Sequence, residues 1–170
     1  MNNNPISIGI SLFLIVLLQI TVVDHFLVFG YMVPLVYLFG ILYLPTKIKP
    51  MSSLLIAFAL GWVIDLFHGT GGIHASACVL LAYVKPFLLR SISTQGGLEY
   101  DKLSIQTLGM PKFLIYSSLG ILTATFWIHL WETFSISLLF SSLLKTILST
   151  VFTLILITLL EMLLYARKEN

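Results

Sequence analysis

Charged side chains are scarce in this sequence. Of its 170 residues, only 9% are Asp, Glu, Lys or Arg, whereas 58% are hydrophobic. Roughly a quarter of the residues of an ordinary soluble domain are charged. So low a charged fraction excludes an ordinary soluble domain and predicts a chain that lies in a membrane.

Cysteine and the common catalytic motifs are also missing or nearly so. Cys78 is the only cysteine and stands in an apolar run, which excludes an internal disulfide and gives no argument for a redox or metal site. The chain has no glycine-rich phosphate loop, no serine-hydrolase elbow, no zinc-protease helix and no Cys-x-x-Cys pair. We therefore predict no enzyme activity, no catalytic residue, no bound metal and no cofactor, and we expect no nucleic-acid partner.

Long apolar runs divide the chain into segments that suit membrane-spanning helices of about 20 residues. The sequence predicts an all-α, polytopic helix bundle that forms a single integral membrane domain over residues 1–170. About six transmembrane helices are expected, near residues 6–23, 26–44, 51–67, 73–89, 113–131 and 146–165, with a cytoplasmic loop over residues 91–112.

The division into spans involves three choices. Residues 6–23 can be interpreted as a retained span or as a cleaved signal peptide. We prefer the retained span, because the basic start and the small-residue cleavage site of a signal peptide are missing. Pro34 is expected to kink the second span. Residues 134–165 are too long for one crossing, so we predict a separate interfacial helix over residues 135–144 before the last span. Lys145 would then lie near the membrane boundary, while Lys85 would reach the interface from the end of the fourth span.

The basic residues predict the orientation. Eight of the nine Lys and Arg residues fall at residues 47–49, 85–112 and 167–168, and six spans place these three regions on one side. The positive-inside rule makes that side the cytoplasm. We therefore expect a multi-pass membrane protein with both termini cytoplasmic.

The most informative stretch is residues 61–75, where an acid, two histidines and four glycines interrupt the apolar sequence. Gly61, Asp65 and Gly69 share one helix face by their spacing of four, and glycines on such a face allow a second helix to approach closely. Gly69, Gly71 and Gly72 also permit backbone conformations that a Cβ forbids. We predict a helix that ends near Gly69, a tight turn, and a second helix that starts near His74.

Two interpretations of Asp65 are open at this point. An acid within a membrane span is a functional candidate, and with His68 and His74 it would supply a proton relay or a cation site. Alternatively, its carboxylate lies against the start of the following helix and accepts hydrogen bonds from amides that have no intrahelical partner. We prefer the second interpretation because a buried charge must be paired whatever its role.

These residues resemble a known family. Pro34, a short basic loop over residues 44–49, and the pattern Gly61-x-x-x-Asp65-Leu-x-x-Gly69-x-x-Gly72-x-His74-Ala75 followed by Tyr83 look like MreD, the bacterial integral membrane rod shape-determining protein. The resemblance is clearest from Val33 to Tyr83. The structural or partner-binding candidates are Gly61, Asp65, His68, Gly69, Gly72 and His74.

The resemblance implies a non-enzymatic component of the cell-elongation machinery in the bacterial cytoplasmic (inner) membrane. Its partners would be membrane lipids, an MreC-like periplasmic protein, the MreB-type cytoskeleton, and the transglycosylase–transpeptidase pair that builds lateral peptidoglycan. The family fold is similar to the substrate-binding subunits of energy-coupling-factor transporters. This similarity supplies the alternative, a small-molecule-binding membrane subunit of a vitamin transporter.

Overall fold

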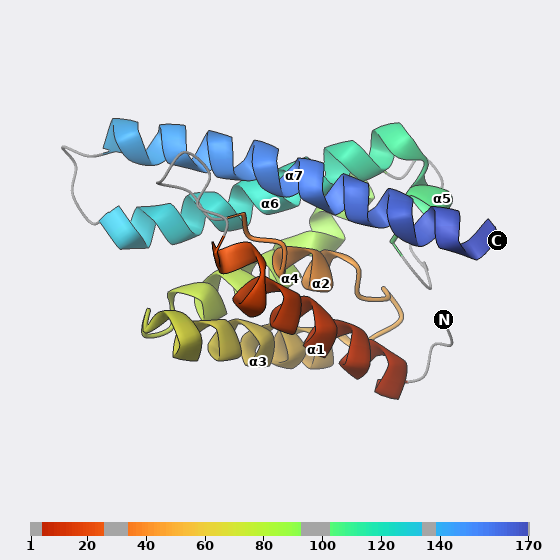
Figure 1. The fold of residues 1–170 in the computed structure, drawn as a ribbon, viewed down its shortest axis with the longest axis horizontal. Coiled ribbons are helices and arrows are strands. Elements are labelled where there is room, and N and C mark those ends of the chain that lie inside the picture. Colours follow the sequence, from red (N-terminus) through yellow and green to blue (C-terminus); the bar gives the residue numbers. More distant parts are fainter. Residues whose placement is uncertain (1–4, 26–33, 93–102, 134–138, 170) are drawn as a thin grey trace.

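A computed structural model describes residues 5–25, 34–92, 103–133 and 139–169, and the structural statements below concern these residues. They form a bundle of helices (Figure 1), and the described ranges contain no β-strand, so the all-α prediction is confirmed. The elements are α1 (Pro5–Thr21), η1 (Val23–His25), α2 (Leu38–Leu42), α3 (Pro50–His68), α4 (Ile73–Ile92), α5 (Ile105–Leu108), α6 (Met110–Thr133) and α7 (Leu139–Glu169).

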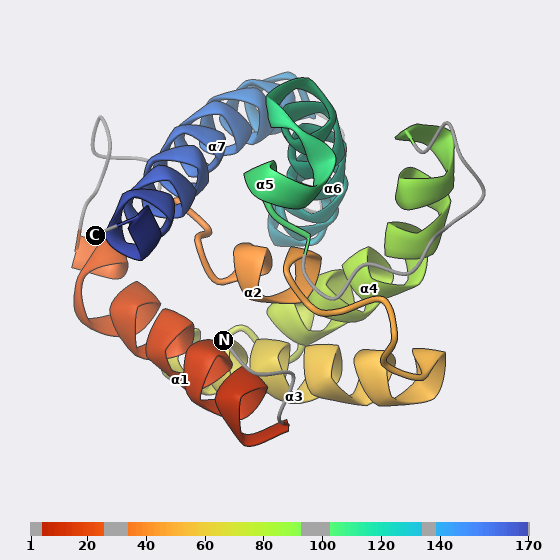
Figure 2. The ribbon, with the colours of Figure 1, turned by 90° about the vertical axis from the view of Figure 1, so that its right-hand side faces the viewer.

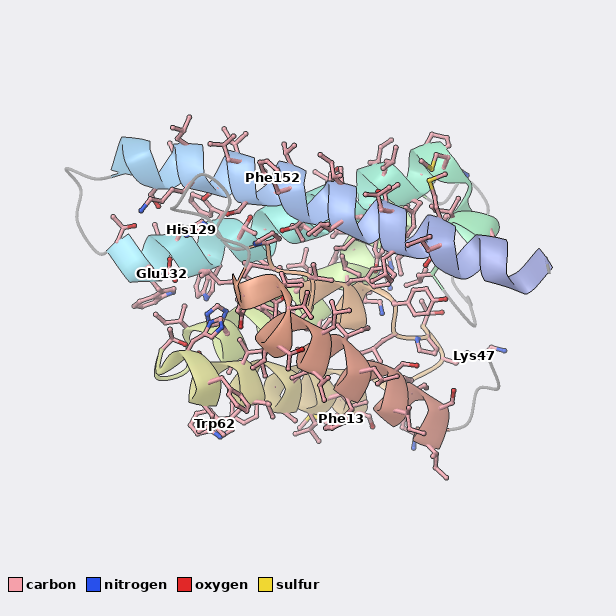
Figure 3. The ribbon with its side chains drawn as sticks, in the orientation of Figure 1. Phe13, Lys47, Trp62, His129, Glu132 and Phe152 are labelled. Atoms are coloured by element: carbon pink, nitrogen blue, oxygen red, sulfur yellow. The ribbon has the colours of Figure 1, made fainter. Side chains whose placement is uncertain are left out.

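Among the described residues, four helices are long and apolar enough to cross a membrane. They are α3, α4, α6 and the part of α7 from Ser142 to Leu163, while the apolar part of α1, Ile6–Thr21, is shorter. Large apolar side chains point outward from the bundle, as Phe13 on α1 and Trp62 on α3 illustrate (Figure 3). Apolar side chains on the outside suit a lipid environment and indicate a membrane protein.

The helices surround a short central element. Along the chain α3 packs on α4, α4 packs on α6, and α6 packs on α7. Viewed along the bundle, α2 lies in the middle of the other helices (Figure 2). All five residues of α2 are buried, so this segment forms part of the core.

The prediction that residues 26–44 form one continuous helix is wrong in its described part. Residues 26–33 lie outside the described residues, and within 34–44 only Leu38–Leu42 is α-helical. Proline 34 has no N–H group and disfavours a helical conformation in the residue before it. We call residues 34–44 the central segment; it is buried apart from Tyr43, and fewer than half of its residues are α-helical. A membrane protein tolerates such a segment only where other parts of the protein form hydrogen bonds with its backbone.

Side chains from α1 and α7 form hydrogen bonds with the backbone at the start of the central segment. The N–H of Leu35 donates to Thr153 Oγ1 on α7 over 3.0 Å. Gln19 on α1 makes two contacts with this segment: its Nε2 donates to the Pro34 carbonyl (2.9 Å), and its Oε1 accepts from the Tyr37 N–H (3.2 Å). Gln19 is completely buried, so these bonds replace the water that its amide would otherwise need.

Two side chains donate hydrogen bonds to the backbone carbonyls at the other end of the central segment. The Lys85 ammonium on α4 donates to the carbonyls of Ile41 (3.0 Å) and Leu44 (2.6 Å). The Tyr116 hydroxyl on α6 donates to the Leu42 carbonyl over 2.9 Å. Lys85 is only 5% exposed, so the expectation that it reaches the membrane interface is wrong. The Ile41 carbonyl also accepts the Leu44 N–H over 3.2 Å, whereas the Leu44 carbonyl lies beyond the end of α2, where no further helical turn supplies a donor. The ammonium is therefore held inside the bundle.

The predicted division of residues 134–165 into two helices is wrong for residues 139–165, while residues 134–138 lie outside the described residues. One helix, α7, runs without interruption over 31 residues from Leu139 to Glu169. Its sequence contains no Pro or Gly that would end a helix. At roughly 1.5 Å per residue its length is about 46 Å, so it extends beyond a hydrocarbon core of about 30 Å. Lys145 is exposed within this helix.

The loop predicted over residues 91–112 is shorter in the structure. Helix α4 continues to Ile92, and α6 begins at Met110. Between them, Ser104 and Thr107 cap the short helix α5, and Gly109 connects it to α6 with a positive φ of 77°. Residues 93–102 lie outside the described residues.

The two ends of the bundle differ in their charged side chains. Helix α1 begins and α7 ends at the same end (Figure 1), where Lys47 also lies, whereas His129 and Glu132 lie at the opposite end (Figure 3). We call the first the basic end, defined by Lys47, Lys49, Arg90 and Lys112, and the second the histidine end, defined by Asp24, His68, His74, His129 and Glu132. Lys145, near the start of α7, is the basic residue that departs from this separation.

Candidate functional site

The site at the histidine end is built around the turn between α3 and α4, residues 69–72, which we call the glycine turn. Gly69, Gly71 and Gly72 adopt φ angles of 67°, 63° and 109°. L-residues with a Cβ rarely adopt these values, so the glycine turn depends on its glycines. Gly69 ends α3 by donating its N–H to the Asp65 carbonyl over 2.7 Å. The predicted role of these glycines in a tight turn is confirmed.

The Asp65 carboxylate lies against the first turn of α4. Its Oδ1 accepts the His74 N–H over 3.0 Å, and its Oδ2 accepts the Ala75 N–H over 2.7 Å. Amides in the first turn of a helix have no intrahelical acceptor, and the helix dipole favours an anion at this position. Asp65 is only 4% exposed. The predicted contact between this carboxylate and the start of the fourth helix is therefore confirmed.

Asp65 also organises the turn through a second set of contacts. Its backbone carbonyl accepts the N–H groups of both Gly69 and Thr70, and its Oδ1 accepts the Thr70 hydroxyl. One residue thus closes the end of α3 and the beginning of α4. Sequence reasoning missed Thr70, although a hydroxyl inside a turn that follows a buried acid is a usable signal.

Gly61 determines how closely α4 approaches α3. A Cβ at this position would lie 2.5 Å from the Ala75 Cα and 2.6 Å from the His74 carbonyl oxygen. Both are backbone atoms, which no side-chain rotation can move away. The predicted close approach is confirmed for Gly61. It is wrong for Gly69, where a Cβ would meet nothing within 4 Å, so Gly69 is needed for its φ angle alone.

The two histidines belong to a neighbouring polar network. His68 Nε2 lies 2.8 Å from Asp24 Oδ2, and His68 Nδ1 lies 3.4 Å from His74 Nε2. On its other side, His74 Nδ1 lies 2.7 Å from the Tyr37 hydroxyl. These contacts connect η1, the end of α3, the start of α4 and the central segment.

Gln19 closes this network into a ring. Its Nε2 donates to Asp24 Oδ1 over 2.7 Å, while its Oε1 accepts the Tyr37 N–H. Sequence reasoning missed Gln19, Asp24 and Tyr37. Gln19 did carry a signal, because it is the only amide side chain in the apolar run of residues 5–23, and a polar group there needs a partner.

The structure separates the groups that the relay and cation hypothesis combined. The carboxylate beside the histidines belongs to Asp24, while Asp65 uses its oxygens on the glycine turn and on α4. Within the described ranges, no group of three His, Cys, Asp or Glu side chains is arranged to hold a metal ion. The site is suited to fixing helix positions, with the exposed His68 at its outer edge.

Substitution of Asp65 tests this structural role. Asp65→Ala leaves the amides of His74 and Ala75 without an acceptor, at about 1–3 kcal/mol for each amide that stays dry. Asp65→Asn keeps one acceptor oxygen and should lose about half as much free energy of unfolding. Thermal unfolding in detergent and folded yield should rank the proteins as wild type, Asn, Ala. An Asn variant that folds like wild type yet fails to restore cell shape would give the ionised group a direct role.

Substitution of Gly61, with Gly9 as a matched control, tests the close approach of α4 to α3. Gly61→Ala should destabilise the protein by about 1–3 kcal/mol because the added methyl group forces α4 away from α3. Gly9→Ala on α1 meets nothing within 4 Å, and should be neutral or stabilising by about 0.5–1 kcal/mol because alanine favours helix. Thermal unfolding of both variants decides the point. Equal stability of the two variants would contradict the packing described here.

Comparisons with known protein families, with curated proteins and with solved structures gave no match. The resemblance to the MreD family therefore rests on the residues of the sequence that carry it. The function has to be argued from the geometry of the site.

Proposed function

We propose that this chain is a non-enzymatic membrane component of the bacterial cell-elongation machinery, with the part that MreD plays. In this role it helps to couple an MreC-like periplasmic protein and the MreB-type cytoskeleton to the transglycosylase–transpeptidase pair that builds lateral peptidoglycan. The chain would act as a scaffold whose shape, not a reaction, is its contribution.

The observation that carries the proposal is the use of the motif residues in packing. Gly61 gives α4 its close approach, and Gly69 and Gly72 supply the backbone angles of the glycine turn. The carboxylate of Asp65 accepts backbone amides through both of its oxygens. A general base or a nucleophile needs a group that can reach a substrate, and a carboxylate occupied in this way is better suited to holding two helices together.

Membrane topology forms part of the same proposal. We take α1, the central segment, α3, α4, α6 and α7 as six crossings, with both termini and the basic end in the cytoplasm of an inner-membrane protein. The separation of Lys47, Lys49 and Arg90 from the histidine end supports this orientation through the positive-inside rule. The glycine turn would then face the periplasm, where an MreC-like partner has its soluble part.

Co-purification tests the proposal. The tagged chain is expressed with the MreC-like protein of its own source, extracted in mild detergent and passed through a sizing column. We expect the two proteins to elute together, and we expect the chain to restore rod shape in cells depleted of their own MreD. A tagged multi-pass membrane protein of similar size is the control for non-specific retention.

The same purified preparation tests the alternative, a small-molecule-binding subunit of a vitamin transporter. If the chain failed to retain the MreC-like protein, but bound an ATPase module and a vitamin at nanomolar affinity, it would be a transporter subunit. A neighbouring reading frame that encodes an ATPase pair would point the same way, whereas one that encodes a single-span periplasmic protein favours the scaffold.

A further inference from the structure

The histidine end contains a continuous row of hydrogen-bonding side chains that the Asp65 contacts do not require. The Tyr37 hydroxyl lies 2.7 Å from His74 Nδ1. His74 Nε2 lies 3.4 Å from His68 Nδ1, and His68 Nε2 lies 2.8 Å from Asp24 Oδ2. We call these four residues the histidine row. The row joins the central segment, α4, α3 and η1.

The two ends of the row determine the direction of its hydrogen bonds. Both Asp24 oxygens face donors, since Oδ1 accepts Gln19 Nε2, and an ionised carboxylate only accepts. His68 therefore carries its proton on Nε2. At the other end, the buried Tyr37 hydroxyl has His74 Nδ1 as its acceptor among the described residues.

One arrangement of protons satisfies the whole row. A neutral imidazole has one N–H group and one acceptor nitrogen. Because His74 Nδ1 accepts the Tyr37 hydroxyl, His74 carries its proton on Nε2 and donates it to His68 Nδ1. Every contact then has one donor and one acceptor, and both rings are neutral.

One further proton disrupts the row at its longest contact. His68 takes this proton, because its side chain is 25% exposed and faces the Asp24 carboxylate, whereas His74 is only 3% exposed. A protonated imidazole has two donors and no acceptor, so two N–H groups would face each other between the rings. A change of tautomer at His74 gives no relief, because it would leave the buried Tyr37 hydroxyl without an acceptor, which is costly.

Other titratable groups act on the row from the elements that pack around it. They are Asp65 on α3, Cys78 on α4, and His129 and Glu132 on α6, with Lys145 on α7 acting on Glu132. Among the hydrogen bonds of the described residues, the carboxylate that contacts a ring of the row is that of Asp24. Protonation of His68 turns this contact into an ion pair, which is stronger than a neutral hydrogen bond. His68 therefore stays with Asp24 when it parts from His74.

We propose that the histidine row is a pH-sensitive link. At neutral pH it joins η1 and α3 to α4 and the central segment, and on acidification it opens between His68 and His74. The Asp65 carboxylate holds the first amides of α4 through separate contacts, so opening changes the surface at this end and leaves the bundle assembled. The link does not depend on a part in cell elongation. The compartment whose pH it senses, the periplasm, rests on the topology proposed above.

NMR of the protein with isotope-labelled histidine in detergent micelles tests the proposal, because the chain has only four histidines. At neutral pH we expect the Nε2–H tautomer for both His68 and His74. We also expect through-space contacts between these rings, whose centres lie 5.1 Å apart. On titration from about pH 8 to about pH 5, the range in which histidine changes its charge, His68 should become doubly protonated and the contacts between the rings should vanish. His74 should keep its tautomer through this step.

Two variants distinguish the link from a passive contact. Asp24→Asn removes the charge that faces His68, so the rings should part only at a roughly tenfold higher proton concentration. His129→Gln is the matched control, because His129 lies at the same end but contacts Glu132, outside the row. It should open at the same pH as wild type.

Several results would overturn the proposal. They are an Nδ1–H tautomer of either ring at neutral pH, protonation of His74 before His68, rings that stay in contact after His68 is protonated, and loss of the folded state before His68 takes up a proton. Opening of wild type and Asp24→Asn at the same pH would also contradict it. If Asp24→Asn fails to fold, the wild-type titration decides the outcome alone.

Discussion

The structure depends on the satisfaction of backbone groups that no water can reach. In hydrocarbon, each unpaired N–H or C=O costs several kcal/mol, so helix ends and non-helical segments need partners inside the protein. Two charged side chains associated with α4 meet this need. Asp65 on α3 accepts the amides at the beginning of α4, and Lys85 on α4 donates to the carbonyls at the end of the central segment. Because α4 also packs on α3 and α6, these two contacts fix the helix to which most of the bundle is attached.

The same requirement explains the central segment. A continuous helix over residues 34–44 would satisfy its own backbone, but the segment is mostly non-helical and buried. Gln19, Thr153, Lys85 and Tyr116, from four different helices, supply the missing partners. The segment therefore joins the surrounding helices by directional contacts, which fix register more sharply than apolar packing between lipid-exposed helices. The scaffold that we propose, which would present a fixed surface to several partners, needs this kind of definition.

Sequence patterns predicted the local features well and the distant ones poorly. Apolar runs gave α1, α3, α4 and α6 nearly their observed bounds, and the spacing of Gly61 and Asp65 predicted the contact with α4, because these features depend on neighbours in the sequence. The backbone groups of the central segment that Gln19 and Lys85 contact lie 15 or more residues away from them, and no local pattern specifies these contacts. The uninterrupted α7 was mispredicted because membrane thickness was treated as a limit on helix length, whereas a helix can continue beyond the bilayer.

Hydrogen–deuterium exchange at the start of α4 tests the central claim most directly. The first amides of a helix normally exchange rapidly because they have no intrahelical acceptor. If the Asp65 carboxylate holds them as described, the amides of His74 and Ala75 should exchange as slowly as that of Leu81 in the middle of α4. The measurement requires residue resolution, by NMR or fragmentation mass spectrometry of the protein in detergent. Exchange at His74 and Ala75 as fast as at Gly71 in the glycine turn would contradict the account.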